Sequence, residues 1–146
     1  MEKQSIVSRS IIKNLIRDAI SGMDQSYAPY SHFKVGAALL TRKKNTYIGC
    51  NVENASFSIT NCAERTTIYK AVSEGEQYFV AIAIAGGPAG VITGYCPPCG
   101  ACRQALREFV DPKKFLVILA KSTEDYSVYF LEELLPLSFG PDNLDK

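Results

Sequence analysis

The sequence predicts an α/β fold in which helices cover a mixed five-stranded sheet. Two observations predict it: apolar residues with helical spacing near the start, and strand-like runs that alternate with helical patterns farther along the chain. A chain of 146 residues with 47% hydrophobic and 21% charged residues has the size and composition of one globular domain. We therefore expect residues 1–146 to form a single domain, and the composition excludes disordered and fibrous proteins.

The first half of the chain is predicted to contain a helix, a hairpin and a second helix. Apolar residues over 11–23 recur every three or four positions, which is the period of an amphipathic helix. The runs Phe33–Leu40 and Thr46–Val52 are rich in strand-forming residues, and the polar turn between them indicates a β-hairpin. A helical pattern then extends to about Ser73, with Asn61 as its expected N-cap.

The second half is predicted to alternate strands with helices. Phe79–Ala85 is apolar on both faces and is typical of a buried strand, as is Phe115–Ala120. A helix is expected between them, from Gly100 to about Phe109. A strand over Ser127–Phe130 and a short helix over Glu132–Leu135 complete the chain.

The connections between these elements predict how the strands pair. The hairpin requires antiparallel pairing, whereas strand–helix–strand units favour parallel pairing with right-handed crossovers. The glycine-rich segment 86–90 is not followed by the Lys-Ser/Thr pair of a phosphate-binding loop, so we expect it to be a turn.

The charge balance narrows the class of partner. Sixteen Lys and Arg residues against fifteen Asp and Glu residues leave a formal net charge of +1. Polynucleotide binding relies on clustered basic residues, so we expect no nucleic-acid polymer as a partner. Residues 1–5 lack the apolar segment of a signal peptide, and no apolar run reaches the roughly 20 residues of a membrane span. We therefore expect a cytoplasmic protein with no membrane partner.

The cysteines are the most informative residues. Cys96, Cys99 and Cys102 fall within seven residues, and in a reducing compartment such a cluster indicates metal or redox chemistry more often than disulfides. Cys62 and the pair Cys99 and Cys102 each lie where a predicted helix begins, and the helix dipole there favours thiolates. These three thiolates could bind one Zn²⁺ per chain and leave its fourth position open for water, which is typical of a catalytic site.

Charged residues beside these cysteines could complete a catalytic centre. Glu64 lies two residues after Cys62, within reach of a water on the zinc ion, and is therefore a candidate catalytic acid and base. Three thiolates leave the zinc site with a net negative charge. Arg65 directly follows Glu64, and Arg103 directly follows Cys102. Both arginines could donate hydrogen bonds to the sulfurs, and Arg65 is favoured for this role.

The segments Cys62-Ala63-Glu64 and Pro98-Cys99-Gly100-Ala101-Cys102 together resemble the signature of zinc nucleoside deaminases. Segments 28–37, 51–55, 62–66 and 134–136 are also similar to those of cytidine deaminases, specifically the short, three-cysteine type. The resemblance covers most of the chain and implies a cytidine deaminase-like three-layer fold. It implies a hydrolase that deaminates free cytidine and deoxycytidine to uridine and deoxyuridine with release of ammonia, a reaction of pyrimidine salvage.

The resemblance also implies roles for individual residues. Glu64 would take a proton from water, protonate the pyrimidine N3 and pass a proton to the departing amine. Asn51 and Glu53 would bind ribose hydroxyls, and residues two apart on a strand do share a face. Phe33 would stack on the pyrimidine, and backbone groups near Ala63 would contact the edge of the base.

Two aromatic residues are expected to act between subunits. The short, three-cysteine members of the family are homotetramers with shared active sites, so the resemblance implies the same assembly here. Phe139 resembles the aromatic lid that another chain contributes. Phe57 stands where relatives usually carry Tyr, so a hydroxyl is lost while the ring remains to contact the substrate. Cys96 is an additional thiol relative to the family's pattern.

Other functions remain compatible with the same residues. A closed four-cysteine zinc site in a structural or interaction module would use Cys96 together with Cys62, Cys99 and Cys102, and it would give Glu64 no role. A small redox protein would use a reversible Cys96–Cys99 disulfide. Deamination of a different aminopyrimidine nucleoside would use the same zinc chemistry.

Overall fold

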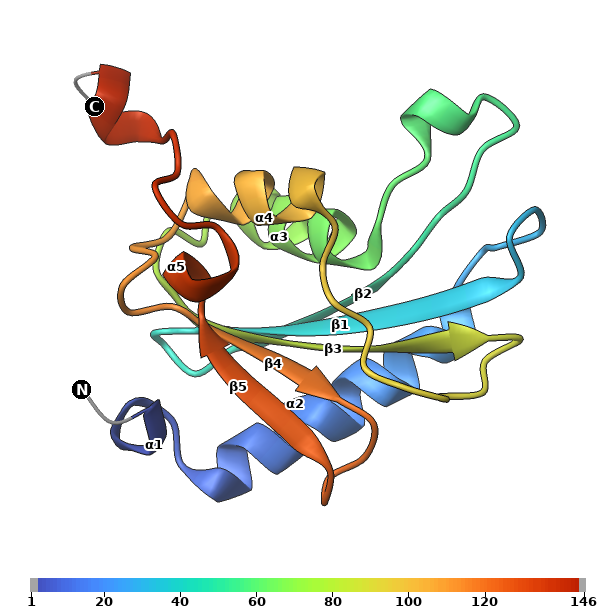
Figure 1. Ribbon diagram of the computed structural model, residues 1–146, viewed down its shortest axis with the longest axis horizontal. Coiled ribbons are helices and arrows are strands. Elements are labelled where there is room, and N and C mark those ends of the chain that lie inside the picture. The colour runs from blue at the N-terminus through green and yellow to red at the C-terminus, as the bar shows by residue number, and fades with distance from the viewer. Residues whose placement is uncertain (1–2, 145–146) are drawn as a thin grey trace.

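The sheet at the centre of the molecule has five strands, and helices cover both of its faces (Figure 1). The computed structural model describes residues 3–144, so residues 1–2 and 145–146 of the expected domain lie outside the described residues. The strands are β1 Phe33–Thr41, β2 Thr46–Cys50, β3 Phe79–Pro88, β4 Leu116–Ala120 and β5 Tyr126–Phe130. They are arranged in the order β2-β1-β3-β4-β5, which confirms the expected mixed five-stranded sheet.

Helices form the two outer layers. They are α1 Lys3–Ile6, α2 Arg9–Gly22, α3 Ala63–Ser73, α4 Gly100–Arg107 and α5 Leu131–Leu134, with 3₁₀ turns at Met23–Gln25, Phe57–Ile59 and Pro141–Leu144. Figure 1 shows α2 below the sheet and α3 and α4 side by side above it. The sequence does not predict α1 or the 3₁₀ turns because so few residues show no periodicity. Within residues 3–144, no helix has both the length and the apolar character needed to cross a membrane.

The apolar core lies on both faces of the sheet because neighbouring strand residues point in opposite directions. Ile118 belongs to the cluster that packs against Leu15 of α2, and Ile82 belongs to the cluster that packs against Ile68 of α3. All four side chains are at most 1% exposed. Burial of each such side chain stabilises the fold by about 1.5–3 kcal/mol, so the sheet holds α3 in a fixed place.

Strand β1 lies between β2 and β3 and pairs with both in antiparallel fashion. The hairpin prediction is therefore confirmed. Among the five strands of the described residues, β3 and β4 are the pair with parallel hydrogen bonding, and α4 connects them. Strands β2 and β3 also run parallel to each other, because both are antiparallel to β1, but they do not pair directly: β1 lies between them and α3 crosses over it.

Strand β3 continues through a segment that we expected to be a turn. Gly86 and Gly87 pair with Val35 and Lys34 of β1, and the strand ends at Pro88. A Cβ atom on Gly87 would lie only 1.9 Å from the carbonyl oxygen of Val91, so the following loop can fold back against the strand only at a glycine. The extension fixes the start of β1.

The backbone before α3 is extended, and this changes the expected start of α3 and the expected end of β2. Val52 and Asn61 form an isolated antiparallel bridge with two N–H···O hydrogen bonds of 2.9 Å. Asn61 is therefore not the N-cap of α3, and Cys62 takes that place with φ −73° and ψ 157°. Strand β2 ends at Cys50, because Val52 pairs with Asn61 rather than with β1.

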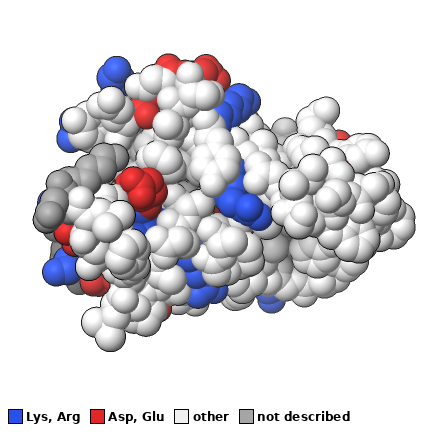
Figure 2. Space-filling view, turned by 90° about the horizontal axis from the view of Figure 1, so that it is seen from above, with Lys and Arg blue, Asp and Glu red and all other residues white. Residues whose placement is uncertain are grey.

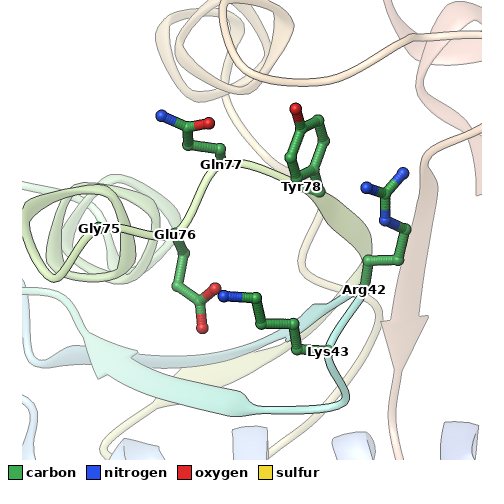
Figure 3. Close-up of a pocket in the computed structure, with 6 residues that line it drawn as sticks. All are labelled: Arg42, Lys43, Gly75, Glu76, Gln77 and Tyr78. Carbon is green, nitrogen blue, oxygen red and sulfur yellow. The ribbon is translucent and has the colours of Figure 1, made fainter.

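A polar pocket lies at the C-terminal end of α3, between that helix and the β1–β2 turn (Figure 3). Its buried carboxylate, Glu76, accepts hydrogen bonds from Asn45 Nδ2 at 3.1 Å and from the Tyr47 hydroxyl at 3.2 Å. The Arg42 guanidinium lies 4.1 Å from the centre of the Tyr78 ring. These contacts join the turn to the end of α3.

We predict that Gly36→Ala destabilises the fold. A Cβ atom at Gly36 would lie 1.9 Å from the Ala19 carbonyl oxygen and 2.7 Å from the Met23 nitrogen, so α2 would have to move off the sheet. The expected loss is about 3 kcal/mol in the free energy of unfolding, measured by urea denaturation. Gly94→Ala is the control, because a Cβ there meets no atom within 4 Å. Equal stability of the two variants would contradict the prediction.

Candidate active site

Three cysteine sulfurs lie together where α3 and α4 begin. The Sγ atoms of Cys62 and Cys99 are 3.9 Å apart, and those of Cys99 and Cys102 are 3.5 Å apart. Among the described residues, these are the three side chains whose potential ligand atoms all lie within 4.8 Å of one another. The fold therefore brings the two cysteine motifs together, although 37 positions separate Cys62 from Cys99.

The helix starts explain how the sulfurs converge. Cys62 and Cys99 are the N-caps of α3 and α4, and both have extended backbone. Neither side chain forms a capping hydrogen bond with its own helix, so both thiols are free to face each other. Cys102 lies in the first turn of α4 and is fully buried. Thiolates in this position also gain from the positive ends of two helix dipoles.

The sulfur cluster fits a zinc ion. Thiolates around a tetrahedral Zn²⁺, each about 2.3 Å from the metal, lie roughly 3.8 Å from one another. The two Sγ–Sγ distances, 3.5 and 3.9 Å, match this spacing. Three thiolates also leave one position of a tetrahedral ion for water.

Arg65 supplies positive charge to the cluster. Its Nη2 donates a hydrogen bond to Cys62 Sγ at 3.3 Å, and its Nε is buried with no hydrogen-bond partner among the described residues. A hydrogen bond from the Cys102 thiol and the contact with Arg65 together lower the pKa of Cys62 to about 5, which favours its thiolate. A guanidinium with a buried, unpaired N–H is well placed beside negatively charged sulfurs.

The hydrogen bonds of Arg103 go to backbone carbonyl groups and not to the sulfurs. Its Nε donates to the Pro98 carbonyl at 2.8 Å and its Nη1 donates to the Leu134 carbonyl at 2.6 Å. Arg103 therefore ties the segment before α4 to the end of α5. Of the two arginines considered from the sequence, Arg65 is the one that contacts the cluster.

Glu64 is buried beside the cluster. It is 4% exposed and lines the same cavity as Cys62 and Cys99. Burial raises the pKa of Glu64 to about 7, with a further contribution from the negative charge of Cys62. A carboxyl group with a pKa near neutrality can both accept and donate protons at physiological pH.

A cavity of about 230 Å³ opens next to the sulfurs and collects the expected nucleoside-binding residues. Phe33, Asn51, Glu53 and Ala63 all line it, together with Glu64. Sequence reasoning missed further lining residues: Ser31, Val35, Thr60, Asn61 and Pro97. The resemblance at segment 28–37 is the signal that could have identified Ser31 and Val35.

Asn51 is held by its neighbours. Its Oδ1 accepts hydrogen bonds from the Ser26 hydroxyl and from the Val35 N–H at 3.0 Å, and its Nδ2 donates to the Phe33 carbonyl at 2.7 Å. An amide group has two N–H donors, so one N–H of Asn51 is left for a ligand. Its side chain also ties the start of β1 to the loop before it.

Glu53 is held in a similar way. It accepts hydrogen bonds from the hydroxyl and the backbone N–H of Ser31 and from the backbone N–H of Tyr30. The hydrogen bonds from Ser31, hydroxyl first, lower the pKa of Glu53. Glu53 therefore presents an ionised carboxylate, an acceptor for hydroxyl groups, at the edge of the cavity.

The two aromatic residues expected to act between subunits lie outside this cavity. Phe57 is 73% exposed and lines a neighbouring pocket with Tyr30, whose ring centre is 5.8 Å from its own. Phe139 is 59% exposed and lies in the C-terminal part of the chain. Neither of the two rings lines the cavity that holds Glu64 and the thiols of its own chain.

Cys96 lines the cavity but does not belong to the sulfur cluster. Its Sγ lies 3.2 Å from the position of a Cβ on Gly86, which places it against β3. Burial raises the pKa of Cys96 to about 11, so its thiol stays neutral. The grouping of Cys62, Cys99 and Cys102 without Cys96 favours an open three-thiolate site over a closed four-cysteine site.

Charges of both signs are mixed on the face of the molecule shown in Figure 2. On the face shown in Figure 2, Lys and Arg atoms lie scattered among Asp and Glu atoms, and the described residues form no continuous basic stripe there. The right-hand end of this face, where the segment between β2 and α3 lies in Figure 1, is largely uncharged. An uncharged ligand suits such a surface better than a phosphate chain does.

Comparisons with known proteins agree with this site. The family model described as the cytidine and deoxycytidylate deaminase zinc-binding region matches residues 9–119. The cytidine deaminase of Sporosarcina psychrophila is 41% identical over 133 residues, which cover 91% of this chain and 94% of the relative. That of Halalkalibacterium halodurans is 42% identical over 131 residues, which cover 90% of this chain and 96% of the relative.

Solved structures have the same fold. The crystal structure of cytidine deaminase from Burkholderia pseudomallei matches with a TM-score of 0.79 at 43% identity, covering 86% of this chain and 97% of that one. The cytidine deaminase from Mycobacterium tuberculosis matches with a TM-score of 0.74 at 35% identity, covering 87% of this chain and 95% of that one. Because the matched region contains the three thiols and Glu64, and because relatives align along nearly the whole sequence, this chain belongs to the cytidine deaminase family of zinc hydrolases.

Proposed function

We propose that this protein catalyses the hydrolytic deamination of cytidine and deoxycytidine to uridine and deoxyuridine, with release of ammonia. One observation carries the proposal: a buried carboxyl group, Glu64, shares a cavity of nucleoside size with a cluster of thiols that fits zinc. The names of the relatives, cytidine deaminases from several bacteria, support cytidine as the substrate.

Cys62, Cys99 and Cys102 would hold the zinc ion in this proposal. When bound, Zn²⁺ supplies the Lewis acidity that lets a water molecule ionise near neutral pH. Arg65 keeps the Cys62 sulfur anionic through its hydrogen bond at 3.3 Å and offsets part of the negative charge of the thiolates. The helix N-termini at Cys62 and Cys99 act in the same direction.

Glu64 moves the protons of the reaction. Its carboxylate takes a proton from the attacking water and delivers it to N3 of the pyrimidine. It then takes the proton of the hydroxyl group newly bonded to C4 and delivers it to the amino group, which leaves as ammonia when the C4–N bond breaks. Burial raises its pKa to about 7, so the cost of protonating it and the cost of ionising it are both small at neutral pH. A fully exposed glutamate would be too weak a base for the first step.

Recognition of the nucleoside uses groups that the fold already holds in place. The remaining N–H of Asn51 donates to a ribose hydroxyl, and the Glu53 carboxylate accepts from one. The Phe33 ring, 39% exposed, stacks on the base. Backbone groups at Ala63 contact the edge of the pyrimidine. The cavity lining supports these roles because it places all four residues around one space.

The proposed assembly is a homotetramer with shared active sites. Phe57 and Phe139 would each contact the nucleoside in a neighbouring subunit, since both residues are more than half exposed and neither lines the cavity of its own chain. Phe57 lies beside the exposed ring of Tyr30, and contiguous exposed apolar surface often marks a place where another protein binds.

The cellular setting follows from the reaction and the cysteines. We propose that residues 1–146 act as one cytidine deaminase-like domain in the cytoplasm, in pyrimidine salvage. All five cysteines are free, which suits a reducing compartment. The reaction converts one free pyrimidine nucleoside into another.

Glu64→Gln tests the proposed acid and base. The amide cannot accept or deliver a proton, so kcat for cytidine should fall at least about 10³-fold, measured from the ultraviolet absorbance change. Zinc content should stay near one per chain because Glu64 is not a ligand in this proposal. Glu74→Gln, at the exposed C-terminal end of the same helix, should keep full activity. Undiminished turnover by Glu64→Gln would refute the proposed mechanism.

Cys99→Ala and Cys96→Ala separate the open zinc site from the closed one. Loss of the Cys99 sulfur leaves two thiolates, so both zinc content and turnover should drop to near background. Cys96→Ala should retain about one zinc per chain and most of the activity, because its sulfur lies outside the cluster. Zinc loss in Cys96→Ala would favour the four-cysteine alternative.

A further inference from the structure

Two side chains of α4 hold the C-terminal segment, residues 135–144, by hydrogen bonds. Gln104 Nε2 donates to the Phe139 carbonyl at 2.9 Å. Arg107 Nε donates to the Ser138 hydroxyl at 2.8 Å, and Arg107 Nη2 donates to the Asp142 carboxylate at 2.7 Å. Residues three apart on a helix share one face, so both side chains can reach the segment together. The contacts fall on both sides of Phe139 and on its own backbone.

Packing strengthens these contacts. The Arg107 side chain is only 11% exposed, although it belongs to a charged residue on an outer helix. Gly140 is buried against it, and a Cβ atom at Gly140 would lie 2.4 Å from Arg107 Cζ. The Arg107 guanidinium therefore occupies the space that a side chain at position 140 would need. The hydrogen bond of Arg107 also lowers the pKa of Asp142, so the pair stays charged.

The Phe139 ring is left exposed while its backbone is held. It is 59% exposed, and Leu137, two residues earlier, has a left-handed backbone conformation with φ 53° and is fully exposed. Figure 1 shows this segment leaving α5 and passing along the end of α4. The same helix begins at the thiols, because Cys99 is its N-cap. Helix α4 and its N-cap thus carry two of the three sulfurs of the cluster, Cys99 and Cys102, as well as the contacts that hold the segment around Phe139.

We propose that Arg107 and Gln104 are positioning residues that clamp the C-terminal segment and so fix where Phe139 presents its ring to bound nucleoside. This inference rests on the proposed function, in which Phe139 contacts the nucleoside of a neighbouring subunit. A held segment loses little conformational freedom when substrate binds, which improves affinity without new contacts. Arg107 contacts Ser138, Asp142 and Gly140 rather than Glu64 or the thiols, so its effect should fall on KM and not on kcat.

Arg107→Met tests the clamp, because methionine keeps much of the side chain's bulk and removes both hydrogen bonds. If the segment then holds Phe139 in place about a tenth of the time, KM for cytidine rises about tenfold while kcat changes less than about twofold. Amide hydrogen exchange over residues 137–143 should become faster. Lys114→Met, which removes an exposed cation elsewhere, is the matched control and should leave KM unchanged.

A double-variant cycle with Phe139→Ala shows whether Arg107 acts through the ring. On that background Arg107→Met should add nothing to KM, because the group it positions is already gone. Asp142→Asn, at an exposed carboxylate, provides a milder version that leaves α4 intact and should raise KM in the same direction. An unchanged KM in Arg107→Met and Asp142→Asn, or multiplicative effects in the double variant, would overturn the clamp. Wild-type protein with bound zinc but no turnover of cytidine would instead refute the proposed function.

Discussion

The rest of the site depends on one constraint: three thiols from two distant segments must approach within about 4 Å of one another for a zinc ion to bind them. Two of the sulfurs belong to N-cap residues, Cys62 of α3 and Cys99 of α4. The constraint therefore fixes where the two helices begin and requires them to start side by side. The sheet makes this possible, because β2 precedes α3, β3 connects α3 to α4, and β4 follows α4. The apolar cluster around Ile82, Ile68 and Leu106 then holds the helices at that spacing.

Three thiolates concentrate negative charge at this site. A guanidinium group and two helix dipoles offset part of that charge. Arg65 places a guanidinium against Cys62, and the helix dipoles of α3 and α4 point their positive ends at the sulfurs. Glu64 is 4% exposed, and its burial, together with the negative charge of Cys62, outweighs the stabilising contributions of Cys102 and Arg65, so its charge is disfavoured and its pKa rises toward neutrality. The same negative surroundings that need compensation at the thiolates thus give the carboxyl group its capacity to move protons.

Local patterns predicted much of this from the sequence. The apolar runs at β3 and β4, the helical periods and the cysteine spacing depend on near neighbours, so a sequence reveals them directly. The continuation of β3 through Gly86 and Gly87 could not be predicted, because pairing with β1 overrides the turn preference of glycine. The pairing of Asn61 with Val52 could not be predicted either, because only the tertiary fold brings these two residues together. The exclusion of Cys96 from the sulfur cluster is likewise decided by tertiary packing against Gly86.

Polar and apolar recognition are organised differently in this chain. Asn51 and Glu53 are fixed by hydrogen bonds within the chain before any ligand binds, so polar contacts to a ribose would need little rearrangement. The aromatic groups Phe57 and Phe139 are instead exposed and lie outside the cavity. Proton transfer by a buried carboxyl group benefits from exclusion of bulk water. If neighbouring chains supply those rings, as we propose, association would close the site as well as stabilise the oligomer, and catalytic efficiency would depend on assembly.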